Sequence, residues 1–133
     1  MISKLKVGDN FEMNRTFSLQ DVIEFSEISG DKNPIHIDPN YAASSVFGAP
    51  IVQGLFVASL FSKIIANHLP GAGSIYLHQS LDFKSPIYHE RNVIARVVIL
   101  SLREDKPIYE LKTTCIDDAG KLLIDGHAVV LKK

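Results

Sequence analysis

The feature that most constrains this fold is an apolar segment, residues 54–68, that precedes a long run of strand-like sequence. After Gly54 the segment reads LFVASLFSKIIANH. Its small residues lie only at Ala58, Ser59, Ser62 and Ala66. A helix that is apolar on nearly every side is typically buried all round. We therefore expect one long, entirely buried helix between Gly54 and about residue 68.

Four strand-like runs follow this helix. The sequence LPGAG at residues 69–73 breaks the helix, and residues 74–83, 92–102, 108–116 and 121–131 then read as strands. Short polar turns join the second run to the third and the third to the fourth. Such turns are typical of antiparallel hairpins.

One buried helix beside four or five antiparallel strands has few packing solutions. The simplest is an α+β fold in which the antiparallel sheet wraps around the long central helix, the hot-dog arrangement. An α+β sandwich with the helix laid flat across the sheet would produce the same pattern. Either sheet has an exposed edge strand, and pairing of two sheets in a homodimer would protect it.

The N-terminal part of the chain predicts a second helix and a loop. Ser18 is placed as N-cap with Asp21 at the capping-box position, and the helix should end near Gly30. Its apolar positions would be Val22, Phe25, Ile28 and Ser29. Residues 30–40 contain two prolines and four Asn or Asp residues, so we expect no regular element there. Pro39 can begin a short helix through Tyr41 and Ala43.

Composition narrows the possible functions. The chain has 133 residues, 46% of them hydrophobic, and a net charge of −1, which fits a single domain over residues 1–133 with no attraction for nucleic acid or an anionic membrane. Cys115 is the only cysteine, so no intramolecular disulfide can form. No signal peptide or run of about 20 apolar residues is present. These features predict a cytoplasmic protein that does not enter membranes.

Asp31 and His36 are the strongest candidates for chemistry. They lie five residues apart on a loop stiffened by Pro34 and Pro39. A carboxylate and an imidazole at that spacing can point at one water molecule, and between them accept and deliver a proton. Asn33 either orients one of the two or holds the turn through an Asx hydrogen bond. The alternative explanation is a turn aspartate and a structural core histidine.

The sequence contains little that would indicate a metal or cofactor site. His36 and Asp38 supply only two ligands, and no second His/Asp cluster lies near them in the sequence, so we expect no metal. The motifs GxGxxG, GxxxxGK[ST] and GxSxG do not occur, which leaves no signature for nicotinamide, P-loop or α/β-hydrolase chemistry. We expect no cofactor.

Gly54 is a candidate through its backbone. Free N–H groups at the start of the apolar helix, at the positive end of its dipole, could polarise a carbonyl oxygen. Alternatively, Gly54 only lets the chain enter the helix below a crowded sheet. Ser62 could reach the same pocket, although a hydrogen bond to a carbonyl one turn back is the commoner role.

The residues resemble a known family. Residues 29–38, SGDKNPIHID, are similar to the hydratase signature of the MaoC-like hot-dog proteins. Residues 49–55, APIVQGL, resemble the family's approach to its central helix, and the similarity continues through 73–77 and 102–108. The chain looks closest to the short (R)-specific enoyl-CoA hydratases. That resemblance implies reversible syn addition of water to a trans-2-enoyl-CoA, without metal or redox cofactor, by a homodimer.

The resemblance also implies roles for individual residues. Asp31 and His36 stand at the positions of the catalytic pair, Gly54 at the oxyanion-hole amide and Asn33 at the supporting asparagine. Gln53 stands where some relatives carry His, next to the oxyanion site.

Substrate contacts are expected further along the chain. An acyl tunnel would run beside the central helix, its depth set by Phe56, Leu60, Ile64 and the facing strands. Lys84, Arg103 and Lys106 are candidates for the CoA phosphates by residue type alone. Two alternatives stay open: an acyl-CoA thioesterase on the same fold, or a non-catalytic acyl-CoA-binding module.

Overall fold

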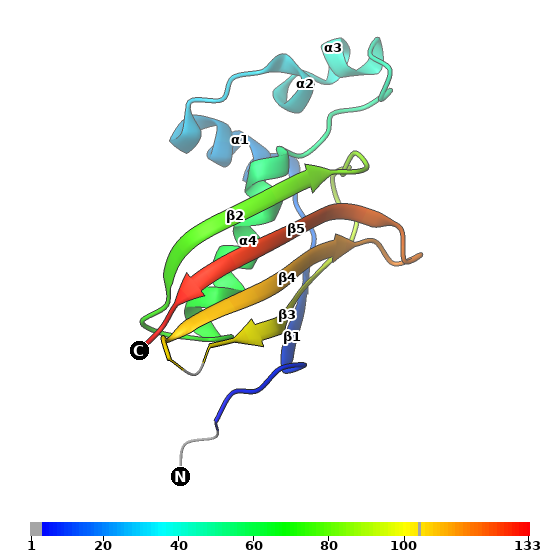
Figure 1. Cartoon of the computed structure of the whole chain (residues 1–133). Coiled ribbons are helices and arrows are strands. Elements are labelled where there is room, and N and C mark those ends of the chain that lie inside the picture. Colours follow the sequence, from blue (N-terminus) through cyan, green and yellow to red (C-terminus); the bar gives the residue numbers. More distant parts are fainter. Residues whose placement is uncertain (1–3, 104) are drawn as a thin grey trace.

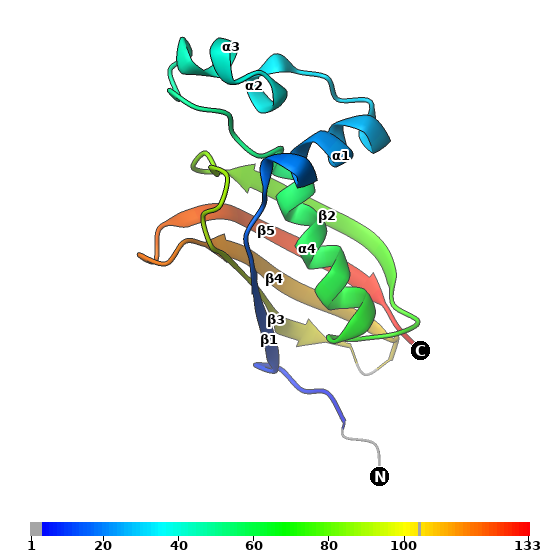
Figure 2. The ribbon, with the colours of Figure 1, turned by 180° about the vertical axis from the view of Figure 1, so that it is seen from behind.

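A five-stranded antiparallel sheet wraps around one long helix. The computed structural model of the chain describes residues 4–103 and 105–133, and the strand order is β1-β3-β4-β5-β2. Figures 1 and 2 show helix α4 along the concave face of the sheet, with α1, α2 and α3 gathered beyond one end of it. In chain order the elements are β1 (Asn10–Arg15), α1 (Leu19–Ser29), α2 (Pro34–Ile37), α3 (Pro39–Ala43), α4 (Gly54–Asn67), β2 (Ile75–Phe83), β3 (Val93–Leu102), β4 (Ile108–Ile116) and β5 (Leu122–Leu131). The wrapped hot-dog arrangement is therefore confirmed, and the flat sandwich is wrong.

The four predicted strands are present within one residue of their expected bounds, but β1 was not predicted. Its sequence, NFEMNR, contains no β-branched residue, so it lacks the usual strand signal. It forms because β3 offers it a free edge, with Asn10 opposite Val98 and Arg15 opposite Val93. Glu104, in the predicted 103–107 turn, and residues 1–3 lie outside the described residues.

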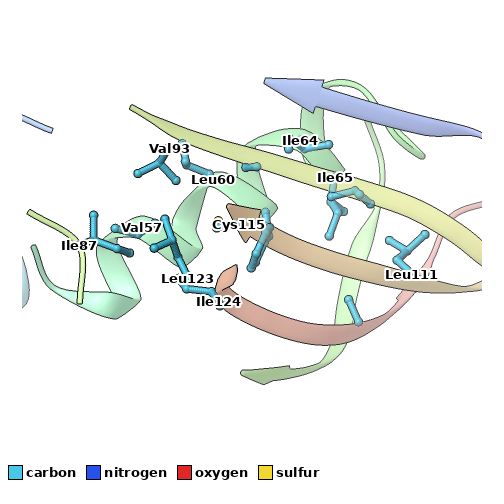
Figure 3. Packing of buried hydrophobic residues seen from close by; sticks show 14 of the residues in the cluster. Val57, Leu60, Ile64, Ile65, Ile87, Val93, Leu111, Cys115, Leu123 and Ile124 are labelled. Atoms are coloured by element: carbon cyan, nitrogen blue, oxygen red, sulfur yellow. The ribbon is translucent and has the colours of Figure 1, made fainter. Parts of the chain in front are cut away.

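The core lies between α4 and the sheet. From α4 it receives Val57, Leu60, Phe61, Ile64 and Ile65, all at most 2% exposed. Figure 3 shows four of these side chains, Val57, Leu60, Ile64 and Ile65, pointing toward residues of β3, β4 and β5, among them Val93, Leu111, Cys115 and Ile124.

The prediction that α4 is buried on every side is wrong. The sheet covers one side of the helix only, and Leu55 on the other side is 65% exposed. The small residues Ser59, Ser62 and Ala66 share this exposed face. The apolar composition of α4 therefore exceeds what its own sheet buries.

Helix α1 begins and ends as predicted. Ser18 and Asp21 form the reciprocal capping box, and Gly30 ends the helix in the left-handed conformation with φ 79°. The backbone hydrogen bond from Ser18 lowers the pKa of Asp21. Ile28, however, is 87% exposed, because it lies two residues, or about 200° around the helix, from the buried Ser26.

The prediction of no regular element between residues 30 and 40 is wrong at 34–37. Pro34 stands at the first turn of the short helix α2, and the Asn33 side chain caps it by accepting from the Ile35 amide at 3.2 Å. Pro at this position has the φ that a helix requires, and its missing N–H would be unpaired there in any case. Helix α3 begins at Pro39 as predicted, capped by Asp38.

Gly126 in β5 gives a test of sheet packing. A Cβ at this position would collide with the Ser80 carbonyl oxygen of β2 and would lie 2.7 Å from Thr113 Oγ1. We expect Gly126→Ala to lower the free energy of unfolding by about 1–3 kcal/mol, as overpacking does, in urea denaturation. Thr114→Ala, a half-buried β4 position, serves as control and should change it by less than about 0.5 kcal/mol. Equal stability of the two variants would contradict this packing.

Candidate active site

A cavity of about 690 Å³ lies where α1, α2 and the start of α4 meet the segment after β2. Four residues predicted for the site line it: Asp31, His36, Gln53 and Gly54. The remaining wall is mostly apolar and includes Phe25, Phe47, Ile51, Val52, Phe83 and Ile87. A mostly apolar cleft with a few polar groups has the character of a small-molecule site.

His36 is held in one orientation by the backbone. It belongs to α2, its side chain is 11% exposed, and its Nδ1 lies 2.8 Å from the Ile51 carbonyl oxygen. A carbonyl only accepts, so Nδ1 carries the proton of this hydrogen bond. In the neutral ring Nε2 therefore keeps its lone pair and is available as a base.

Asp31 lies on the other side of the same small space. Its Oδ2 is 3.9 Å from His36 Nε2, too long for a direct hydrogen bond. A water molecule about 2.8 Å from both atoms would fit this separation and could donate one proton to each. The second carboxylate oxygen, Oδ1, accepts from the Asn33 amide at 3.1 Å.

The Asp31 backbone is also fixed. Its carbonyl oxygen accepts from Ser26 Oγ at 2.5 Å, and its amide donates to Ser29 Oγ at 3.1 Å. Ser26 is 1% exposed and lies on α1. The loop that carries the carboxylate is therefore tied to α1 at two points.

Asn33 supports the turn through its side chain, and its backbone carbonyl accepts from the His36 amide at 3.1 Å. Its side-chain oxygen accepts from the Ile35 amide, and its own amide donates to Asp31. Of the two roles open from the sequence, the structure shows the Asx hydrogen bond.

The first turn of α4 brings backbone N–H groups to the cavity. The first hydrogen bond within the helix runs from the Val57 amide to the Gln53 carbonyl, so the amides of residues 54–56 precede it. Gly54 is close-packed against Phe83: a Cβ at position 54 would lie 2.5 Å from Cε1 of that ring. The absence of a side chain thus lets an aromatic wall approach the helix start.

Gln53 ties α4 to α1. It is 2% exposed, and its Nε2 donates to the Val22 carbonyl at 3.0 Å. Its Oε1 is buried with no hydrogen-bond partner among the residues that the structure describes. Gln53 also lines the cavity.

Other residues expected at the site lie elsewhere. Leu60 and Ile64 are in the core, at most 1% exposed, and Phe56 stacks on Phe25 with ring centroids 4.6 Å apart. None of these three lines the 690 Å³ cavity, so the expectation that they set its depth is not met. Ser62 lies on the exposed face of α4, away from this cavity.

The three basic residues considered for the CoA phosphates also lie in different parts of the structure. Lys84 lines the cavity. Arg103 and Lys106 lie in the turn between β3 and β4, at the opposite end of the sheet from the cavity (Figure 1), and Arg103 pairs with Asp105 at 2.6 Å. Of the three candidates offered by residue type, only Lys84 lines this cavity.

Sequence reasoning missed Ser26, Ile51 and Phe83. Ile51 acts through its backbone and Phe83 through a contact with a distant segment, and no local motif marks the hydrogen bond from the Ser26 hydroxyl to the Asp31 carbonyl. Cys115 is fully buried, and burial raises the pKa of its thiol to about 12.

Two further findings concern ligands and membranes. Within residues 4–103 and 105–133, no group of three His, Cys, Asp or Glu side chains is arranged to hold a metal ion. Over the same residues, no helix is long and apolar enough to cross a bilayer.

Comparison with known proteins gives the family. Residues 4–117 match the model of the MaoC like domain. The chain is 45% identical over 126 residues to an (R)-specific enoyl-CoA hydratase of Aeromonas caviae, covering 95% of this chain and 94% of that protein. It is therefore a member of the MaoC-like family.

Two more relatives show how far the similarity extends. A solved structure of the (R)-hydratase from A. caviae superposes with a TM-score of 0.95 at 43% identity, over 99% of this chain and 100% of that chain. A mitochondrial 3-hydroxyacyl-[acyl-carrier-protein] dehydratase of Solanum lycopersicum is 43% identical over 129 residues, which is 96% of this chain and 77% of that protein.

The hydrogen bond from Ser26 to Asp31 can be tested through stability. We expect Ser26→Ala to lower the free energy of unfolding by about 1–2 kcal/mol, because it leaves a part-buried carbonyl without its donor. Urea denaturation measures this change. The control is Ser44→Ala, where an exposed 3.4 Å hydrogen bond is lost and little should change. A Ser26→Ala variant as stable as the parent would show that this bond contributes nothing.

Proposed function

We propose that this chain is an (R)-specific enoyl-CoA hydratase, in which Asp31 and His36 activate water and the Gly54 amide polarises the thioester carbonyl. The reaction adds water reversibly across the double bond of a trans-2-enoyl-CoA and yields the (R)-3-hydroxyacyl-CoA. The observation that carries the proposal is the 3.9 Å separation of Asp31 Oδ2 and His36 Nε2 in an apolar cavity that the start of α4 also lines.

The first requirement of the reaction is a reactive water. Asp31 Oδ2 and neutral His36 Nε2 are both acceptors, so a water held between them donates both protons and points its oxygen lone pairs at the substrate. As the oxygen bonds to the β-carbon, one water proton passes to the pair. The pair also delivers the proton that the α-carbon receives.

Both new bonds then form on one face of the substrate. Oxygen and hydrogen come from the same small region between Asp31 and His36, so the addition is syn. We assign the proton transfers to the pair as a unit, because coupled groups titrate and react together.

The second requirement is a place for the negative charge that develops on the thioester oxygen. The amide N–H of Gly54 and the positive end of the α4 dipole stabilise an enolate oxygen at the helix start. Gln53 holds that start against α1 through Val22. This arrangement needs no metal and no redox cofactor.

The exposed apolar residues of β2 bear on how the chain assembles. β2 is an edge strand, and Ile75, Leu77 and Phe83 along it are each more than half exposed. Leu55 on α4 is exposed as well. β1, the other edge, is shorter and more polar. An apolar edge without lysine or proline favours pairing with a second copy through β2, and hence a homodimer.

A cytoplasmic location agrees with a single buried thiol.

Substitution of the carboxylate tests the proposed reaction. We expect the purified protein to lower the enoyl-thioester absorbance of crotonyl-CoA to an equilibrium value, and Asp31→Asn to lower kcat on the order of 10²-fold or more, because an amide cannot accept a proton. His36→Gln should act in the same direction. Lys106→Ala, at the other end of the sheet, is the control.

Three outcomes would count against the proposal. Full activity in Asp31→Asn would show that the reaction does not require the Asp31 carboxylate. Release of free thiol from crotonyl-CoA without hydration would favour a thioesterase. Binding of crotonyl-CoA in calorimetry with neither reaction would favour a non-catalytic module.

The proposed dimer has its own test. We expect sedimentation equilibrium at micromolar concentration to return twice the chain mass, and Leu77→Asp to return a single-chain mass, since it places a charge on the apolar edge of β2. Leu100→Asp, on β3, should leave the dimer intact. A parent protein that sediments as a monomer would contradict the assembly.

A further inference from the structure

A second cavity, of about 400 Å³, adjoins the first on the outer side of the segment after β2. Both cavities share Pro86 and Ile87 in their walls. Ile87 is 5% exposed and separates them, whereas Pro86 is exposed at their common rim. A flexible ligand seated in the first cavity can therefore pass over Pro86 into the second.

The two walls are also linked by a hydrogen bond. Tyr88 lines the second cavity, and its hydroxyl donates to the Phe47 carbonyl at 3.0 Å, while Phe47 lines the first. The rim between the cavities is thus a fixed part of the structure. The ring of Tyr88 gives the second cavity an aromatic surface, which a planar base can contact.

Three basic side chains follow this path. Lys84 stands in the first cavity, and Arg91 and Lys121 stand in the second. All three are exposed. Among the described residues the ion pairs of Lys and Arg use Arg15, Lys32, Arg103 and Lys112, and none uses these three.

The two carboxylates in the second cavity each accept hydrogen bonds from neutral N–H donors through Oδ1, and both keep their negative charge. Asp117 Oδ1 accepts from the amides of Ala119 and Lys121, each at 2.9 Å, and thereby forms the turn before β5. Asp118 Oδ1 accepts from Asn92 Nδ2 at 2.8 Å. Neither forms an ion pair with Arg91 or Lys121 in the described structure, so these cations remain available to an anion.

We propose that Arg91 and Lys121 bind the phosphate groups of the 3′-phospho-ADP end of CoA in this second cavity, with Lys84 beside the pantetheine arm. The assignment rests on the proposed function, which places the thioester at Gly54. An acyl-CoA carries its negative charges at the far end of a long uncharged arm, so those charges must lie outside the first cavity. A concave site of about 400 Å³ is better suited to binding a nucleotide than to binding the surface of another protein.

A pair of substrates isolates this contribution. Crotonyl-CoA carries the phosphates, and crotonyl-pantetheine has the same reacting atoms without them. For the double variant Arg91→Ala/Lys121→Ala we expect KM for crotonyl-CoA to rise about five- to tenfold, with kcat unchanged. KM for crotonyl-pantetheine should stay within about twofold of the parent value. The matched control is Arg103→Ala/Lys106→Ala, which removes two cations from the opposite end of the sheet and should change neither KM.

Several results would overturn the assignment. An unchanged KM for crotonyl-CoA would remove Arg91 and Lys121 from binding, and an equal rise for both thioesters would show a general disturbance of the site. A rise seen only with crotonyl-acyl-carrier protein would assign these cations to a carrier protein instead.

A binding experiment tests the cavity without catalysis. Calorimetric titration with adenosine 3′,5′-bisphosphate should show binding to the parent protein, and at least about fivefold weaker binding to the double variant. If the parent hydrates neither thioester but binds this nucleotide through the two cations, the hydratase proposal fails and the nucleotide site stands. Binding that is equal in both proteins overturns the site.

Discussion

The packing of one face of α4 against the sheet is the constraint on which the rest of the structure depends. Leu60, Ile64 and their neighbours bury this face almost completely. A helix fixed along its length has a fixed first turn, and here that turn carries Gly54 to the wall of the cavity. The packing of α4 on the sheet thereby sets the position of the backbone N–H groups that a thioester oxygen would meet.

The polar half of the site is positioned by hydrogen bonds to backbone carbonyls. Ser26 holds the Asp31 carbonyl, Gln53 holds the Val22 carbonyl and the Ile51 carbonyl holds His36. Two of these bonds involve α1, and the third joins α2 to the segment before α4. Consequently Asp31, His36 and Gly54 lie in different segments of the chain but are held in fixed positions relative to one another. Such preorganisation keeps charged and polar groups in place without direct contact between them.

The elements that local patterns describe were predictable from the sequence. The Ser18–Asp21 capping box, the turn residues around the hairpins and the apolar run after Gly54 all specify their structure within a few residues. The exceptions have physical causes. β1 forms only because β3 offers an edge, and α2 forms because Asn33 and Pro34 complete a helix start inside what composition describes as a loop.

The site was predictable to the extent that its residues lie close together in sequence. Asp31, His36, Gln53 and Gly54 line one cavity, as expected, but the helical spacing of Phe56, Leu60 and Ile64 indicated a tunnel where the structure has core. Helical periodicity identifies an apolar face and does not distinguish a face that packs on a sheet from one that lines a cavity.

The cations at the two ends of the sheet differ in whether they are paired. A net charge of −1 excludes a strong overall field, so binding of an anionic ligand depends on where individual cations stand. Arg103 is neutralised by Asp105 at one end of the sheet, whereas Lys84, Arg91 and Lys121 are unpaired in the described structure at the end that holds both cavities. In the proposed hydratase, the water and the thioester react in the first, mostly apolar cavity, and the charged end of the ligand lies outside it. This separation avoids the cost of burying phosphate charges in the apolar cavity that holds the Asp31–His36 pair.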